Sequence, residues 1–481
     1  MKMTHKISYS LVLLLFLFFS CQDNRQARDH MNQLPHIFPD YTNVTIPYNI
    51  APIDFQIKGA THMQATFYVH NDLVLQANGG TYVKIPSKKW KQLLETNKGR
   101  DLTISVSAWT PEHPEGATYK PFRIHIDNSP IDNYVAYRLI PPGYEEWNRM
   151  GIFQRNLTSF DESAIFINTQ NHSGCVNCHN FAWYNPQKMM FHARGPAGGT
   201  VIMQGDNIEK INLDSLGPKK NGTYPMWHPS GKYIAFSSNI TKQSFYSHCR
   251  DKIEVYDLKS DIIIYDVMHH KVLADKRFND SINWETFPAF SPDGKWLYFC
   301  TAKAKLMPIK FNELHYSLIR VPFNEKDGSL GAEIDTIYSA AKEGGSISLP
   351  RISPDGRYVL LTWAGCSTFH IQHKDADLML IDLKTRQIIH PKNVNSNDAD
   401  SYHSWSQNGK WIIFASRRLD GMYSRLYIAP FKNGNFGKPF LLPQKDPQEN
   451  KRRLYSYNIP EFIRAKVVLS KDKASALFKV N

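Results

Sequence analysis

The sequence predicts an all-β protein in two parts, an N-terminal β-sandwich-like domain followed by a β-propeller. The first observation is composition: 24 Tyr, 27 Phe and 10 Trp accompany 26 Gly and 28 Pro, a mixture typical of strands joined by turns. The second is a series of short alternating strands early in the chain. The third is a strand–turn–strand unit that recurs through the second half, as in propellers.

The first twenty residues have the layout of an export signal. Basic residues precede an apolar run over residues 11–19. That run is too short to cross a bilayer, so we predict a signal peptide over residues 1–20. Phe18-Phe19-Ser20-Cys21 resembles a bacterial lipobox, although that motif prefers Leu at its first position. The resemblance implies lipidation of Cys21, and a secretion signal with an incidental cysteine is the alternative.

Three segments separate the leader from the repeats. Residues 21–40 are polar and predict a tether. Residues 41–132 predict the β-sandwich-like domain, and residues 133–180 a connector. Within the domain we expect strands at residues 65–69, 102–107 and 122–126, and a helix over residues 87–96 with Ser87 as its N-cap.

Four copies of one pattern follow, each with two strands separated by a tight turn. The turn sequences are His228-Pro-Ser-Gly231, Ser291-Pro-Asp-Gly294, Ser353-Pro-Asp-Gly356 and Ser406-Gln-Asn-Gly409. Proline presets φ early in such a turn, and glycine supplies the positive φ that ends it. A fainter copy covers residues 181–193. A unit of about four strands cannot bury its faces alone, so its repetition predicts a propeller over residues 181–481.

The Ser-Pro-Asp-Gly-(Lys/Arg) units resemble the TolB-type propeller repeat, a PD40 or WD40-like unit. That resemblance implies six blades, of which the sequence displays five. The whole chain resembles a family of exported envelope lipoproteins of Gram-negative bacteria, on the stretches His192–Gly195, Ser401–Trp405 and Tyr457–Phe462. It implies a cell-envelope protein, lipid-anchored to a bacterial membrane and facing the periplasm or the cell surface. We expect the basic C-terminal tail to close the propeller ring or to pack on the β domain.

The most specific motif is Cys175-Val-Asn-Cys178-His179, the C-x-x-C-H pattern of c-type haem attachment. There, two thiols form thioethers with the haem and the adjacent imidazole ligates the iron. We therefore predict haem c on Cys175, Cys178 and His179. His192 is the candidate sixth ligand, and an open or water-ligated iron is the alternative. A Cys175–Cys178 disulfide and a metal site on the same three residues stay open as interpretations.

A second group of candidates lies where the blades open on the central channel. The innermost strand of each blade lines that channel, so we expect a pore-mouth binding site that uses Glu285, Tyr402, His403 and Arg417. A hydrogen-bonded structural role is the alternative for His403, and a solvated charge the alternative for Arg417. Hydrolase chemistry is disfavoured, because the sequence contains no G-x-S-x-G.

Charge and motifs narrow the function. The chain carries a net charge of +13 but no nucleic-acid motif, so we expect solvated surface charge and no nucleic-acid partner. The first hypothesis is a haem protein that transfers electrons or senses redox state. The second is a non-enzymatic scaffold whose propeller face binds a protein or glycan partner. A third, weaker hypothesis is an enzyme that acts at the channel mouth through His403.

Overall fold

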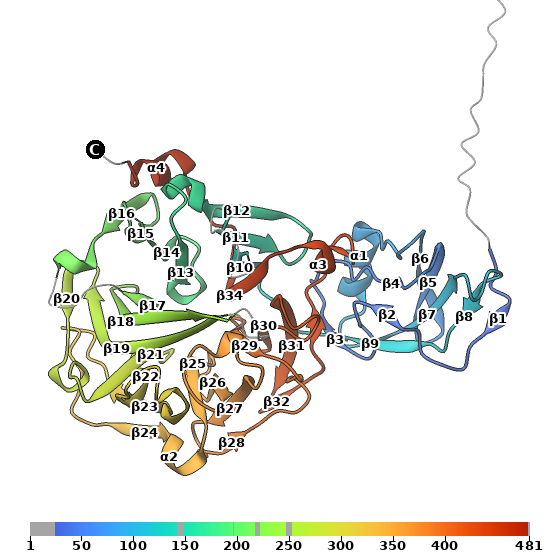
Figure 1. The fold of residues 1–481 in the computed structure, drawn as a ribbon. Helices are drawn as coiled ribbons and strands as arrows, with labels where there is room; N and C mark the ends of the chain where they lie inside the picture. Colours follow the sequence, from blue (N-terminus) through green and yellow to red (C-terminus); the bar gives the residue numbers. More distant parts are fainter. Residues whose placement is uncertain (1–24, 142–148, 196, 217–221, 247–252, 480–481) are drawn as a thin grey trace, which may run out of the picture.

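The computed structural model describes residues 25–141, 149–195, 197–216, 222–246 and 253–479. The predicted signal peptide and the predicted lipidation site at Cys21 lie outside these residues. The N-terminal domain and the propeller lie side by side (Figure 1). Within the described ranges, no helix is long and apolar enough to cross a membrane.

The N-terminal domain is one mixed sheet with a helix against it. Its strands run in the order β1-β8-β7-β5-β6, and β9 pairs with β7 and β3. The bounds are β1 Asp29–His30, β3 Thr45–Pro47, β5 His62–Val69, β6 Asp72–Gly79, β7 Asp101–Trp109, β8 Ala117–Thr118 and β9 Phe122–Asp127, with β2 Ile37–Phe38 and β4 Gln56–Ile57 as a separate pair. Alternate residues of β5 are buried, as a period of two requires. Helix α1 (Ser87–Thr96) has the predicted bounds, but Pro86 and not Ser87 takes the cap position.

Six sheets of four or five strands surround a central channel and form a six-bladed propeller (Figure 1). Blades 2 to 6 follow the chain, each from its innermost strand outward. Their strands are β13 Val176–Phe181, β14 Lys188–Ala193, β15 Gly199–Gln204 and β16 Asn207–Ile211; β17 Thr223–Trp227, β18 Tyr233–Phe245, β19 Ile253–Asp266 and β20 Lys271–Leu273; β21 Asn283–Phe290, β22 Trp296–Lys303, β23 Ser317–Pro322 and β24 Asp335–Tyr338; β25 Ser346–Ile352, β26 Tyr358–Ala364, β27 Asp377–Asp382 and β28 Ile388–Ile389; β29 Asp400–Trp405, β30 Trp411–Ser416, β31 Arg425–Lys432 and β32 Asn435–Phe436, with β33 Phe440–Leu441. The predicted all-β class and the six blades are confirmed.

Blade 1 joins the two ends of the propeller chain. Its innermost strand, β34 (Ser456–Ile463), pairs with β10 (Tyr134–Ile140), and β11 (Gly151–Asn156) and β12 (Glu162–Ile167) complete the sheet. The expected connector over residues 133–180 therefore differs from the structure, since much of it is propeller. Because the first strand of this blade lies at the far end of the chain, its strand–turn–strand unit is split in the sequence. The C-terminal tail closes the ring, one of the two outcomes expected for it.

Each innermost strand carries a residue with a left-handed backbone conformation, at or next to a break in strand register. The φ values of these residues lie between 42° and 54°, and the register shifts are typical of β-bulges. The six residues, here called the bulge ring, are Cys178, Tyr224, Phe287, Leu349, Tyr402 and Ile459. The next residue is proline in four blades and histidine in two, His179 and His403. The Cys-His of the C-x-x-C-H motif thus occupies a repeat position of the fold.

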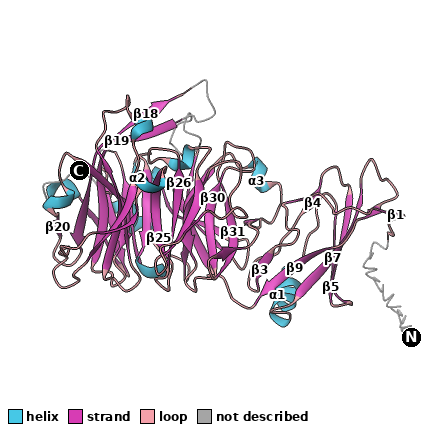
Figure 2. Ribbon diagram, turned by 90° about the horizontal axis from the view of Figure 1, so that it is seen from below, coloured by secondary structure: helices cyan, strands magenta, loops and turns pink. Residues whose placement is uncertain are grey.

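The predicted turns close the opposite, lower face of the propeller. Their four glycines have φ between 66° and 72°, the region that a side chain disfavours. In blade 4, Ser291 Oγ donates to Asp293 Oδ1 at 2.6 Å and accepts from the Trp296 N–H at 3.0 Å. The innermost strands begin at the other face, here called the upper face, where the loops between second and third strands differ among blades. There the β18–β19 hairpin projects beyond the other blades (Figure 2).

Candidate functional site

A cavity of about 470 Å³ opens at the upper face, at the mouth of the central channel. Four members of the bulge ring line it: Cys178, Tyr224, Tyr402 and Ile459. Its volume falls in the range of small-molecule sites, roughly 300–1,000 Å³. Because neighbouring blades contribute different loops around a common opening, the two sides of the cavity differ in chemistry.

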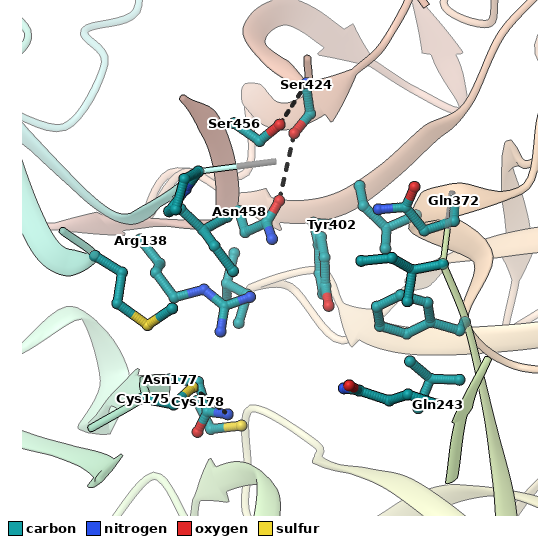
Figure 3. Close-up of a pocket in the computed structure, with 18 of the residues that line it drawn as sticks. Arg138, Cys175, Asn177, Cys178, Gln243, Gln372, Tyr402, Ser424, Ser456 and Asn458 are labelled. Atoms are coloured by element: carbon teal, nitrogen blue, oxygen red, sulfur yellow. Dashed lines mark hydrogen bonds between the residues drawn. The ribbon is translucent and has the colours of Figure 1, made fainter. Parts of the chain in front are cut away.

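One wall, from blades 1 and 2, is cationic. It carries Arg138 of β10 and Arg194, which follows β14, and Figure 3 shows Arg138 extending between Asn458 and Cys178. With its amide oxygen toward Arg138, Asn458 accepts from Nη2 at 3.0 Å. The Nε of Arg138 is buried without a hydrogen-bond partner. In the part of the chain that the structure describes, neither arginine forms an ion pair and no Asp, Glu or His lines the cavity.

The opposite wall is largely apolar. Ile253 and Val255 of β19 lie on this side, with Phe369 and Ile371 from the loop between β26 and β27. The amides of Gln243 and Gln372 face the cationic wall across the cavity (Figure 3). A ligand that spans the opening therefore meets Arg138 and Arg194 at one end, and at the other a mainly apolar wall that also carries Arg417.

The motif cysteines line the cavity as free thiols, 8% and 7% exposed for Cys175 and Cys178, and no disulfide joins them. Burial raises the pKa of Cys178, and the nearby guanidinium groups of Arg138 and Arg194 oppose that shift. The positive charges of Arg138 and Arg194 are therefore both felt at the same place in the cavity wall, the thiol of Cys178. Asn177 lies between the cysteines in sequence, and its Nδ2 donates to Cys175 Sγ at 3.8 Å.

His179 does not share the cavity with the thiols. It lines a separate space of about 20 Å³ deeper in the channel, enclosed by the bulge ring. That volume accommodates about one water molecule and not a porphyrin. Burial lowers the pKa of His179 to about 3, with the charge of Arg138 acting in the same direction. Cys178 lines both spaces, whereas Cys175 lines only the cavity and His179 only the smaller space. This arrangement does not fit a haem held by all three residues on one side of the ring.

The other predicted ligand, His192, is also outside the cavity. It lies on β14 beside Asn177 of β13, where its Nδ1 makes a 3.2 Å hydrogen bond with Thr200 Oγ1. Burial lowers its pKa to about 4. No group of three or more His, Cys, Asp or Glu side chains that could hold a metal ion occurs among the described residues.

The pore-mouth candidates divide into two pairs. Tyr402 and Arg417 line the cavity, and Arg417 Nη1 donates to the Gln372 carbonyl at 3.1 Å. Glu285 and His403 are buried away from it, and Glu285 Oε1 accepts from Thr301 Oγ1 at 3.3 Å. His403 Nε2 donates to the Leu360 carbonyl of blade 5 at 2.9 Å, and burial lowers its pKa to about 3. This hydrogen bond is of the kind that the structural alternative for His403 expects.

Sequence reasoning missed Arg138, Arg194 and Asn458. Arg138 and Asn458 belong to the split blade 1, so no repeat pointed to them. Arg194 stands in the stretch His192–Gly195, which supported the family resemblance without a role for any of its residues. The signal that could have identified Arg194 is its position directly after the second strand of a blade, because residues at that position lie at the upper face.

Comparison with family models finds no match, and comparison with curated proteins finds none either. Among solved structures, TolB from Acinetobacter baumannii aligns over 78% of this chain and 85% of its own, with 13% identity and a TM-score of 0.44. The propeller domain of the Trilobed protease from Pyrococcus furiosus aligns over 63% and 80%, with 12% identity and a TM-score of 0.35. The Pseudomonas aeruginosa periplasmic gluconolactonase PpgL aligns over 68% and 99%, with 12% identity and a TM-score of 0.36. The assignment to a six-bladed propeller rests on the six sheets themselves.

Proposed function

We propose that this chain is a non-enzymatic scaffold of the bacterial envelope, which docks a protein partner on the upper face of its propeller. The observation that carries the proposal is a set of exposed apolar side chains on two neighbouring blades. This apolar rim consists of Ile240, Phe245 and Leu258 on the β18–β19 hairpin, and Ile282, Leu306 and Ile309 beside β21 and β22, each 44–80% exposed. Clustered exposed apolar groups mark interaction surfaces, because water solvates them poorly.

The position of the apolar rim supports docking at the channel mouth. Ile282 directly precedes the innermost strand of blade 4, and its carbonyl accepts from the Ala304 N–H at 2.9 Å. The loop that carries Leu306 and Ile309 is therefore held at the upper face. A partner seated there would contact the projecting hairpin and cover the cavity. A glycan partner, the other expectation from the sequence, finds less support in a rim of aliphatic side chains.

Export and anchoring complete the proposal. The leader supports envelope localisation, and lipidation of Cys21 would tether the chain to a membrane through the polar segment over residues 21–40. Haem c stays a prediction from the motif. The thiols of Cys175 and Cys178 face the cavity, whereas His179 lies outside it.

Site-specific photocrosslinking in the envelope tests the docking surface. A photoreactive phenylalanine analogue replaces Phe245 or Ile309, and the same analogue at Leu73 on β6, which is 59% exposed, serves as the matched control. We expect one discrete protein adduct from both rim positions and none from Leu73. Equal crosslinking at all three positions, or none at the rim, contradicts the proposal. An adduct with glycan in place of protein assigns the partner to the other class.

A further inference from the structure

We propose that the cavity at the channel mouth binds an amphipathic organic carboxylate, with its headgroup at Arg138 and Arg194 and its apolar body against the β19 wall. This inference concerns a small molecule inside the cavity. It does not depend on a protein partner at the apolar rim, which lies outside it.

The headgroup end is built for an anion. Arg138 and Arg194 line it, and among the described residues neither has a carboxylate partner. The Nε of Arg138, a hydrogen-bond donor, is buried without a partner in the part of the chain that the structure describes. Buried polar groups without partners are costly, and a bound carboxylate would accept charge-assisted hydrogen bonds from the guanidinium groups. A cationic headgroup would instead face uncompensated positive charge.

The other end selects for hydrocarbon. Ile253, Val255, Phe369 and Ile371 offer side chains without hydrogen-bonding groups, so displacing water from them favours an apolar ligand by roughly 25 cal/mol per Å² buried. Arg417 also lines the cavity, but its Nη1 already donates to Gln372. A small hydrophilic anion would leave water in contact with these apolar side chains. A neutral hydrocarbon would fill it but desolvate the arginines without compensation. A ligand that carries both features satisfies both walls at once.

Calorimetric titration of the mature full chain with three probes of equal chain length tests this inference. The probes are decanoate, decanol and decylamine, all below their micelle concentrations. We expect decanoate to bind at least tenfold more tightly than decanol, and decylammonium to bind most weakly. Equal affinity for decanoate and decanol, or no binding of decanoate, overturns the inference. Crosslinking at the apolar rim would be unaffected by either result, so the docking proposal is judged separately.

Variants locate the binding. Arg138→Gln and Arg194→Gln should each weaken decanoate binding by about tenfold, which is about 1.4 kcal/mol, and leave decanol unchanged, because each removes a charge-assisted hydrogen bond to the carboxylate. Arg123→Gln, on the exposed side of β9, is the matched control and should change neither. Because Arg194 is exposed, its variant should fold even if the Arg138 variant does not. Decanoate affinity that survives both cavity substitutions contradicts the assignment.

A second readout uses the thiols of the cavity wall. Saturating decanoate should slow maleimide labelling of Cys175 and Cys178, while labelling of Cys366, outside the cavity, should not change. Slowed labelling of Cys366 alone, or unchanged labelling of both cavity thiols, would place the probe elsewhere and overturn the inference.

Discussion

Blades 2 and 6 share one local backbone structure, although only the sequence of blade 2 resembles a haem-attachment motif. Cys178-His179 and Tyr402-His403 each place a left-handed residue in the bulge ring and a histidine behind it. Both left-handed side chains line the cavity, and burial lowers the pKa of both imidazoles to about 3. Blade 6 has no cysteine three residues before its bulge, so nothing there resembles haem attachment. Blade 6 has a histidine at the same repeat position without any attachment motif. The position of His179 in the repeat can therefore explain this histidine without a cofactor.

Proline substitutions in the bulge ring are expected to give the largest difference in the free energy of unfolding. Cys178→Pro should lower the free energy of unfolding by about 3 kcal/mol or more, because proline cannot adopt the φ of 54° found there. His179→Pro should keep the fold and lose much less, since four blades carry proline at that position. Urea unfolding followed by circular dichroism measures both.

Equal losses in the two variants would show that blade 2 does not follow the backbone rule of its neighbours. Tyr402→Pro and His403→Pro in blade 6 are the matched controls, and the same order is expected there, although His403→Pro also removes the hydrogen bond to the Leu360 carbonyl.

A smaller effect concerns pH. The folded pKa values of His179 and His403 are about 3, below the ordinary 6.5, so the unfolded chain binds protons that the folded chain does not. Stability from this source is fully present above about pH 6.5 and falls as pH drops toward 3, by up to about 1.4 kcal/mol per pH unit for each histidine. His403→Gln should flatten the slope of unfolding free energy between pH 6 and pH 4, measured in urea, by about one such contribution.

The half-exposed His125 of β9 supplies the control for the pH experiment. His125→Gln should leave most of the slope in place. A slope unchanged by His403→Gln would mean that the imidazole of blade 6 is accessible to protons in the folded state, which its burial contradicts.

The smallest effect is in thiol reactivity. Peptide mass spectrometry over a maleimide time course should find Cys366 labelled first, Cys175 and Cys178 more slowly, and Cys300 last, because Cys300 is fully buried in β22. Burial also raises the pKa of Cys300, which further lowers its thiolate population. Labelling of Cys300 as fast as Cys178 would contradict the difference between a cavity wall and a core strand.

The repeat made most of the propeller predictable from the sequence. Turn glycines and period-two strands are local signals, so blades 2 to 6 and α1 followed from short stretches. Blade 1 did not, because β34 and β10 lie at opposite ends of the propeller chain and only tertiary pairing joins them.

The site was less predictable. Tyr402 and Arg417 reach the cavity as expected, whereas the bulge turns His403 away from it. The C-x-x-C-H spacing specified residue types but not the strand bulge that directs His179 away from the cavity lined by Cys175 and Cys178. A motif of five residues carries no information about the bulge ring, which arises only when six blades close.

Intact mass and the reduced absorption spectrum of the mature chain, produced in cells that possess the haem-attachment machinery, test the place of Cys178-His179 most directly. If the repeat alone explains Cys178-His179, Cys175 and Cys178 are free thiols and the reduced protein shows no haem c absorption. An added mass of one haem on those two cysteines, together with a haem c spectrum, would contradict it.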